Sequence, residues 1–182
     1  MFYIIGLGNP GEEYKNSRHN AGRMAVELFS RLFAKEQPKK ATIIESSEFM
    51  NHSGRAVAKY IKSKKMTQSL IVIYDDIDLT LGTIKISYNK NSGGHRGLES
   101  VIKTLKTKEF TRIRIGTSPS ASAETSAGKA KKPQGEKKVL DFILGKFKPS
   151  EQFVLKKVFK TVSQAIQTMM EDGREKAMNQ FN

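Results

Sequence analysis

The 182-residue chain contains no cysteine. This absence excludes disulfides, thiolate nucleophiles, iron–sulfur clusters and cysteine-based zinc sites. Long hydrophobic runs are also missing, since no stretch approaches the roughly 18 apolar residues that a membrane span requires. The opening residues, Met1 to Gly8, lack the basic segment and the cleavage site of a signal peptide. We therefore expect a soluble protein of the cytoplasm.

Acidic residues are few relative to basic ones. Asp and Glu number 18 against 32 Lys and Arg, which gives a formal net charge of +14. An excess of this size favours a polyanionic partner, either nucleic acid or an anionic membrane surface. The length suits one well-cored domain, so we interpret residues 1–182 as a single domain.

Apolar periodicity predicts strands and helices in alternation. The expected strands cover residues 2–7, 41–45, 70–74, 83–88 and 110–115. The expected helices cover residues 20–33, 53–62, 98–105, 139–145 and 150–171, the last capped by Ser150. This order predicts an α/β fold, a single-domain three-layer sandwich with a mixed, mainly parallel central β-sheet and helices on both faces. Residues 117–138 are rich in Ser, Ala, Gly and Lys and are predicted to form a flexible basic loop.

The strongest predicted strand, residues 70–74, runs directly into Asp75. Its residues are apolar on both faces, which indicates a central strand, and the carboxyl end of such a strand is where open α/β sheets bind ligands. A histidine beside Asp75 would form a general-base pair, because the carboxylate fixes the imidazole tautomer while the other ring nitrogen takes a proton from water. Position alone does not choose between His19, His52 and His95, and their spacing predicts no metal site.

Two amides and a glycine-rich segment lie near the same predicted edge. Asn9 and Asn51 are able to hold or polarise a carbonyl group, as an oxyanion site requires. Residues 6–11 match the G-x-G-x-x-G pattern of dinucleotide sites, but polar residues follow instead of a helix, and Pro10 removes a backbone donor. The nearest acidic residue at the expected spacing, Glu27, falls inside a predicted helix. A generic nucleotide-binding α/β domain therefore stands only as an alternative.

Five motifs in order closely resemble those of the bacterial peptidyl-tRNA hydrolase family. They are IGLGNPG (5–11) with Tyr14 and RHNAG (18–22), FMNHSG (49–54), YDDIDL (74–79) with Gly82, GGHRGL (93–98) and FTRIRIG (110–116). A fainter similarity covers residues 142–147. The resemblance implies that family's fold and hydrolysis of the ester between peptide and tRNA, without metal or cofactor. It also implies a monomer that binds the acceptor stem and 3′ end of peptidyl-tRNA and no membrane.

The resemblance also implies roles for individual residues. His19 is the general base that activates water, Asp75 stabilises the proton-accepting form of His19, and Asn9 contacts the substrate near the scissile bond. Arg112 or Arg114 is expected to reach a phosphate of the tRNA. The residues implied to bind substrate or tRNA are Tyr14, Phe49, Met50, Asn51, His95, Arg96 and Arg114, with the two aromatic rings stacking on bases of the 3′ end.

Three departures from the family pattern bear on this interpretation. Arg96 stands where the family usually carries Asn, so the contact of that amide must be made differently. A shortened segment between Phe33 and Phe49 predicts the loss of one edge strand. Residues 117–138 are longer and more basic than usual, and they either contact tRNA or form a solvated linker. Because of Arg96, a non-catalytic RNA-binding relative, similar to chloroplast group II intron splicing factors, remains the main alternative.

Overall fold

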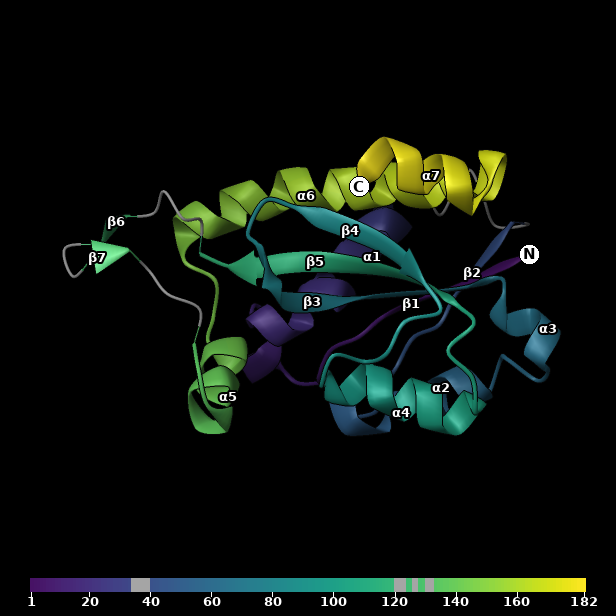
Figure 1. The fold of residues 1–182 in the computed structure, drawn as a ribbon, viewed down its shortest axis with the longest axis horizontal. Helices are drawn as coiled ribbons and strands as arrows, with labels where there is room; N and C mark the ends of the chain where they lie inside the picture. The colour runs from purple at the N-terminus through teal and green to yellow at the C-terminus, as the bar shows by residue number, and fades with distance from the viewer. Residues whose placement is uncertain (34–39, 120–123, 126–127, 130–132) are drawn as a thin grey trace.

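The computed structural model describes residues 1–33, 40–119, 124–125, 128–129 and 133–182 (Figure 1). Its main sheet has five strands in the order β2-β1-β3-β5-β4. Strand β1 pairs in parallel with β2 and β3, β3 pairs in parallel with β5, and β4 is antiparallel to β5. The strands are β1 (Phe2–Gly6), β2 (Ala41–Ile43), β3 (Leu70–Thr80), β4 (Ile84–Tyr88) and β5 (Thr111–Ser118).

Helices cover both faces of this sheet (Figure 1). On one face lie α1 (Ala21–Phe33), α6 (Pro149–Asp172) and α7 (Arg174–Phe181), and on the other lie α2 (Ser53–Ala58) and α4 (Arg96–Leu105). The remaining helices are α3 (Lys64–Thr67), α5 (Glu136–Leu144) and the short 3-10 turns η1 (Glu12–Tyr14), η2 (Arg18–Asn20) and η3 (Met50–His52). The single-domain three-layer α/β sandwich with a mixed, mainly parallel sheet is confirmed.

Strand β3 divides the core into two apolar clusters. Ile71 and Ile73 pack in the cluster beneath α1 and α6, whereas Leu70, Val72 and Tyr74 pack in the cluster beneath α2 and α4. Successive side chains of a strand point to opposite faces, so a strand that is apolar at every position fits only in the middle of a covered sheet. No helix in the described part of the chain has the length and apolarity needed to cross a membrane.

Several element boundaries differ from the sequence expectations. Strand β3 continues past Tyr74 to Thr80 because Asp75 and Asp76 pair with β5. Helix α6 starts at Pro149, and Ser150 is not its cap. Instead, the Lys148 backbone N–H donates to the Glu151 carboxylate at 2.7 Å, and a proline is well tolerated at the first helical position. Helix α7 was not predicted.

The boundaries of the predicted basic loop, residues 117–138, are also corrected. Thr117 and Ser118 belong to β5, and α5 starts at Glu136. Within the segment, β6 (Glu124–Thr125) and β7 (Gly128–Lys129) form an antiparallel pair. Residues 120–123, 126–127 and 130–132 lie outside the described residues, as do residues 34–39 in the shortened segment. The loss of an edge strand there stays a prediction.

The outer edge of β4 is covered at one point by a side chain. The Ile86 N–H donates to the Asn182 side-chain oxygen at 2.6 Å, and the Asn182 amide nitrogen donates to the Ile86 carbonyl at 3.1 Å. These are the two bonds that the peptide group of a neighbouring strand would make. Near the same edge, the Arg174 guanidinium lies 3.7 Å from the centre of the Tyr88 ring.

The first turn of α1 sits directly against the sheet, and only glycine fits there. A Cβ atom on Gly22 would lie 2.1 Å from the Ile73 carbonyl oxygen, and one on Gly6 would lie 2.2 Å from the Gly22 oxygen. We expect Gly22→Ala to lower the free energy of unfolding by at least about 2 kcal/mol, because backbone must move to admit the methyl group. Urea denaturation measures this loss. Arg31→Ala, on the exposed side of the same helix, is the control, and equal stability of the two variants would contradict the tight contact.

Candidate active site

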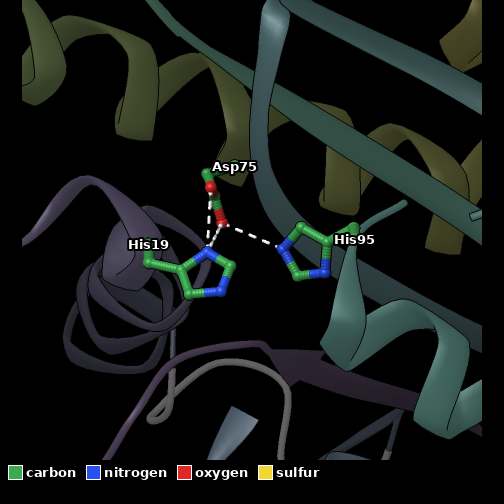
Figure 2. Close-up of side chains that lie close together, drawn as sticks. All are labelled: His19, Asp75 and His95. Atoms are coloured by element: carbon green, nitrogen blue, oxygen red, sulfur yellow. Dashed lines mark hydrogen bonds and ion pairs between the residues drawn. The ribbon is translucent and has the colours of Figure 1, made fainter. Parts of the chain in front are cut away.

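Three side chains from separate elements meet at Asp75, near the middle of β3 (Figure 2). His19 lies on η2, Asp75 on β3, and His95 at the N-cap of α4. His19 Nδ1 is 2.9 Å from Asp75 Oδ1 and 3.0 Å from Oδ2, and His95 Nε2 is 3.0 Å from Oδ1. All three side chains are nearly buried. The structure thus brings His19 to Asp75, as a general-base pair requires, and adds His95, a contact that the sequence analysis missed.

The hydrogen bonds determine which ring nitrogens carry hydrogen. The Leu98 backbone N–H donates to His95 Nδ1 at 3.2 Å, so His95 Nε2 carries the hydrogen that is donated to Asp75. An ionised carboxylate only accepts, so His19 Nδ1 also donates to it. His19 Nε2 is left with a lone pair that is able to take a proton.

The charge of Asp75 is stabilised in spite of its burial. Burial alone would raise the pKa of this carboxyl, but its charge interactions and hydrogen bonds with His19 and His95 outweigh that effect and hold the pKa well below its usual range. The adjoining Tyr74 stays neutral, because burial raises its pKa to about 12. Its ring packs edge-on against the His95 ring at a centroid distance of 4.8 Å. Asp75 is therefore an anion held between two imidazole N–H donors.

The same three residues are the one group in the described ranges with the composition of a metal site. Their potential ligand atoms lie within 4.8 Å of one another. Zinc binding would need a lone pair on His95 Nε2. That nitrogen carries hydrogen, because Nδ1 of the same ring already accepts from Leu98. The bonding pattern fits a carboxylate that orients two imidazoles better than it fits a metal centre.

Buried contacts fix the segment that carries His19. Next to it, Arg18 donates to both carboxylate oxygens of Glu151 on α6 at 2.9 Å. The Arg18 guanidinium also lies over the rings of Phe142 and Phe147, at 4.7 and 4.8 Å from their centres. Through its neighbour Arg18, His19 is thereby linked to helices α5 and α6, a contact that sequence spacing did not reveal.

Asn9 is held by a second amide, Asn20. The Asn9 N–H donates to Asn20 Oδ1 at 2.8 Å, and Asn20 Nδ2 donates to the Asn9 carbonyl at 2.9 Å. The Met50 backbone N–H occupies Asn9 Oδ1 at 2.8 Å, which leaves Nδ2 as the group able to donate to a substrate. The sequence analysis overlooked Asn20, although its position directly after His19 in the RHNAG motif was a usable signal.

The group formed by His19, Asp75 and His95 opens on a cleft of about 790 Å³. Its walls come from the ends of β3, from β4, from the loop before α4 and from α5. Arg96 lines it and pairs with Glu136 of α5 at 2.8 Å, and both side chains are largely exposed. Arg114 lines it as well and pairs with Asp76 at 2.6 Å. Both cations predicted to bind tRNA thus reach the cleft, each next to a carboxylate.

His95 lines the cleft as well, whereas the remaining predicted binding residues lie outside that lining. Tyr14 is half-buried, Phe49 is 54% exposed, and Asn51 is exposed beside His52. Met50 is only 5% exposed and belongs to the core beneath α2 and α4, so its side chain packs under the site rather than facing the cleft. Arg112 is completely buried, so of the two arginines for which a phosphate contact was expected, Arg114 is the one that lines the cleft.

Comparison with known proteins identifies the family to which the chain is similar. The family model for peptidyl-tRNA hydrolase matches residues 3–182. The chain belongs to the peptidyl-tRNA hydrolase family. The match extends the resemblance from residue 116 to the C-terminal helices, and it confirms both the family and the expected enzyme class.

Individual peptidyl-tRNA hydrolases are similar over nearly their whole length. That of Sulfurihydrogenibium sp. (strain YO3AOP1) is 38% identical, with 98% of this chain and 96% of the relative covered. That of Persephonella marina is 33% identical with the same coverage. The crystal structure of the peptidyl-tRNA hydrolase from Acinetobacter baumannii superposes with a TM-score of 0.79 at 25% identity, covering 100% of this chain and 94% of that one.

Proposed function

We propose that this chain hydrolyses the ester bond between peptide and tRNA in peptidyl-tRNA, which frees the tRNA for further translation. The observation that carries the proposal is the nearly buried His19–Asp75 pair, whose His19 side chain lines the cleft and keeps a proton-accepting nitrogen. Hydrolysis of the ester between the peptide carboxyl group and the ribose needs an activated water, and a positioned neutral imidazole supplies one.

The geometry supports a reaction in two steps. His19 Nε2 takes a proton from water while the oxygen attacks the ester carbonyl carbon, and the Nδ1–H bond to Asp75 stabilises the imidazolium that forms. Asn9 Nδ2 donates to the carbonyl oxygen as negative charge develops there. The bond to the ribose oxygen then breaks, and the proton returns from His19 to that oxygen. The peptide leaves as a carboxylic acid and the tRNA with a free ribose hydroxyl.

The remaining predicted residues are proposed to bind the tRNA end and the peptide. The net charge of +14 attracts the phosphates of the acceptor stem, which supply most of the affinity of such complexes. Arg96, Arg114 and His95 lie at the cleft for the ester and the neighbouring phosphates. Tyr14 and Phe49 offer rings for the 3′ bases, Asn51 offers an amide for the peptide, and Met50 supports Asn9 through its backbone N–H.

We propose that residues 1–182 act as one monomeric domain in the cytoplasm, where peptidyl-tRNA arises.

Release of labelled N-acetyl-aminoacyl groups from tRNA tests the proposed function. The expected result is fast release from the blocked substrate and no release from unblocked aminoacyl-tRNA, which is the control. Tight binding of tRNA without release would instead support the non-catalytic RNA-binding alternative.

Arg96→Asn tests the residue that departs from the family pattern. Because the Arg96 side chain is largely exposed at the cleft, we expect it to act on phosphate rather than on the ester. The variant should raise KM, leave kcat within about threefold, and reduce the slope of log affinity against log salt by about 1. Glu136→Gln removes the carboxylate that faces Arg96 and should lower KM. A fall of tenfold or more in the kcat of Arg96→Asn would assign Arg96 a role at the reacting atoms.

A further inference from the structure

Arg112 is the largest fully buried side chain in the described part of the chain, with 0% exposure. It lies on β5, and its guanidinium stacks over the Phe110 ring at 4.3 Å from the ring centre. Its bonds to described residues go to backbone carbonyls and none goes to a carboxylate, while its Nε atom is buried without a hydrogen-bond partner. Burial lowers the pKa of Arg112 from its usual value. Burying a charge without a counter-ion destabilises the folded state, so we expect the role of Arg112 to lie in its hydrogen-bond partners.

The principal contact of Arg112 is to the loop that connects β4 to α4. Arg112 Nη2 donates to the Lys90 carbonyl at 2.6 Å, whereas its Nη1 contact to the Phe110 carbonyl is long, at 3.5 Å. The loop, residues 89–95, has no strand partner over most of its length, and three of its residues have left-handed backbone: Asn89, Gly93 and Gly94, with φ of 50°, 62° and 82°. Because residues 89–95 lie outside any helix or strand, their conformation depends on the hydrogen bonds that they make to the rest of the fold.

The anchored loop ends at His95. The other side-chain contacts along it are exposed: Lys108 donates to the Asn91 side chain at 3.0 Å, and Ser92 Oγ donates to Glu99 at 3.1 Å. The His95 N–H then donates to the Ser92 carbonyl at 3.2 Å, and the His95 ring donates to Asp75. Among the residues that the structure describes, the Arg112 bond to Lys90 is therefore the one side-chain attachment of this loop upstream of His95 that comes from a fully buried residue.

We propose that Arg112 is a positioning residue for the catalytic group. By holding the Lys90 carbonyl, it fixes the 89–95 loop in the conformation in which His95 Nε2 donates to Asp75. That bond in turn holds the carboxylate in the orientation in which it accepts from His19 Nδ1. Arg112 is not among the residues that line the cleft, and its short hydrogen bond goes to Lys90, so we assign its effect on His95 to the loop. The inference rests on the proposed role of the His19–Asp75 pair.

A double-mutant cycle between Arg112 and His95 distinguishes positioning from packing. Arg112→Met keeps an apolar stem over Phe110 but removes the donor to Lys90. We expect kcat to fall about tenfold and KM to rise by a smaller factor, because loosening the loop disturbs His95 directly and the cleft wall before Arg96 to a lesser extent. His95→Ala should lower kcat by at least as much, and the double variant should be no slower than His95→Ala alone. Effects that multiply would overturn the inference, as would a wild-type kcat for Arg112→Met.

Nitrogen NMR of the imidazoles supplies a readout that does not need the reaction. Wild type should show His95 as the Nε2–H tautomer with a slowly exchanging ring proton. Arg112→Lys, which keeps one donor and is the variant to use if Arg112→Met does not fold, should lose that protection in part. Lys108→Ala, which removes only the exposed attachment at Asn91, should keep it. An unchanged His95 signal in Arg112→Lys would refute the positioning role even if the enzyme proved inactive on peptidyl-tRNA, so the two failures are distinguishable.

Discussion

His19→Ala is expected to reduce the release of N-acetyl-aminoacyl groups from tRNA by at least about 10²-fold, the contribution typical of a positioned general base. The variant removes the ring nitrogen that accepts the proton of water, and no other imidazole in the described residues has a lone pair in the same position. His95 does not replace it, since its Nε2 donates to Asp75 and its Nδ1 accepts from Leu98. Affinity for tRNA should stay within about twofold of wild type, because the His19 side chain is nearly buried and carries no phosphate contact.

Single-turnover release and filter binding of tRNA, measured on the same preparation, test this expectation. His52→Ala is the control, since His52 lies on η3, away from His19, Asp75 and His95, and its ring is hydrogen-bonded to the neighbouring Asn51. That variant should retain release within about twofold. Near-normal release by His19→Ala would refute the general-base assignment, whereas a parallel loss of tRNA binding would show that the histidine serves recognition.

Asp75→Asn is expected to have the next largest effect, a fall in kcat of about 10²-fold or more. Asp75 Oδ1 accepts from both imidazoles, and an asparagine oxygen is able to keep those two bonds. The new amide nitrogen, however, replaces Oδ2 at 3.0 Å from His19 Nδ1, where two donors would face each other. His19 must rotate away or move its hydrogen to Nε2, and either change removes the proton-accepting nitrogen from the cleft.

The same variant should change how stability depends on pH. The pKa of Asp75 is lower in the folded protein than in the unfolded chain, where it is about 3.9. Ionised Asp75 therefore stabilises the fold above pH 4, and this contribution is lost as the pH falls toward the folded pKa. Asp75→Asn lacks the titrating group, so its free energy of unfolding should fall less steeply with acid. Urea denaturation at a series of pH values measures both slopes, and parallel slopes would contradict the contribution of Asp75.

Local pattern was sufficient to predict the central strand and the carboxylate that follows its apolar run, but not that the strand continues past Asp75 to Thr80. Residues 70–74 are apolar on both faces, and only a covered central strand accommodates that pattern. The contact between His95 and Asp75 was not predictable in the same way, because the loop before His95 has three left-handed residues and is hydrogen-bonded to Arg112 of a distant strand. Neither feature has a periodic signature in the sequence.

The two arginines of β5 show the same limit. Alternation correctly placed Arg112 and Arg114 on one face of the strand, but it did not distinguish their surroundings. Arg112 lies deeper along β5, opposite Val72 of β3, and is covered by the loop before α4, whereas Arg114 pairs in register with Tyr74 and reaches the cleft. Sheet register and loop path, which are tertiary properties, decide which guanidinium meets solvent.

Helix α7 was missed for a related reason, since it packs on α6 and β4 rather than showing a strong apolar pattern of its own.

The contact between Asn182 and the outer edge of β4 bears on how this protein behaves at high concentration. Edge strands present unsatisfied backbone groups that recruit strands from other copies and lead to aggregation. The Asn182 amide satisfies the two outward groups of Ile86, in the middle of the strand, and Arg174 places a positive charge over Tyr88 at its end. At Ile86, a strand of a second copy therefore finds no free backbone donor or acceptor on the antiparallel edge of the main sheet, which disfavours strand-to-strand association there.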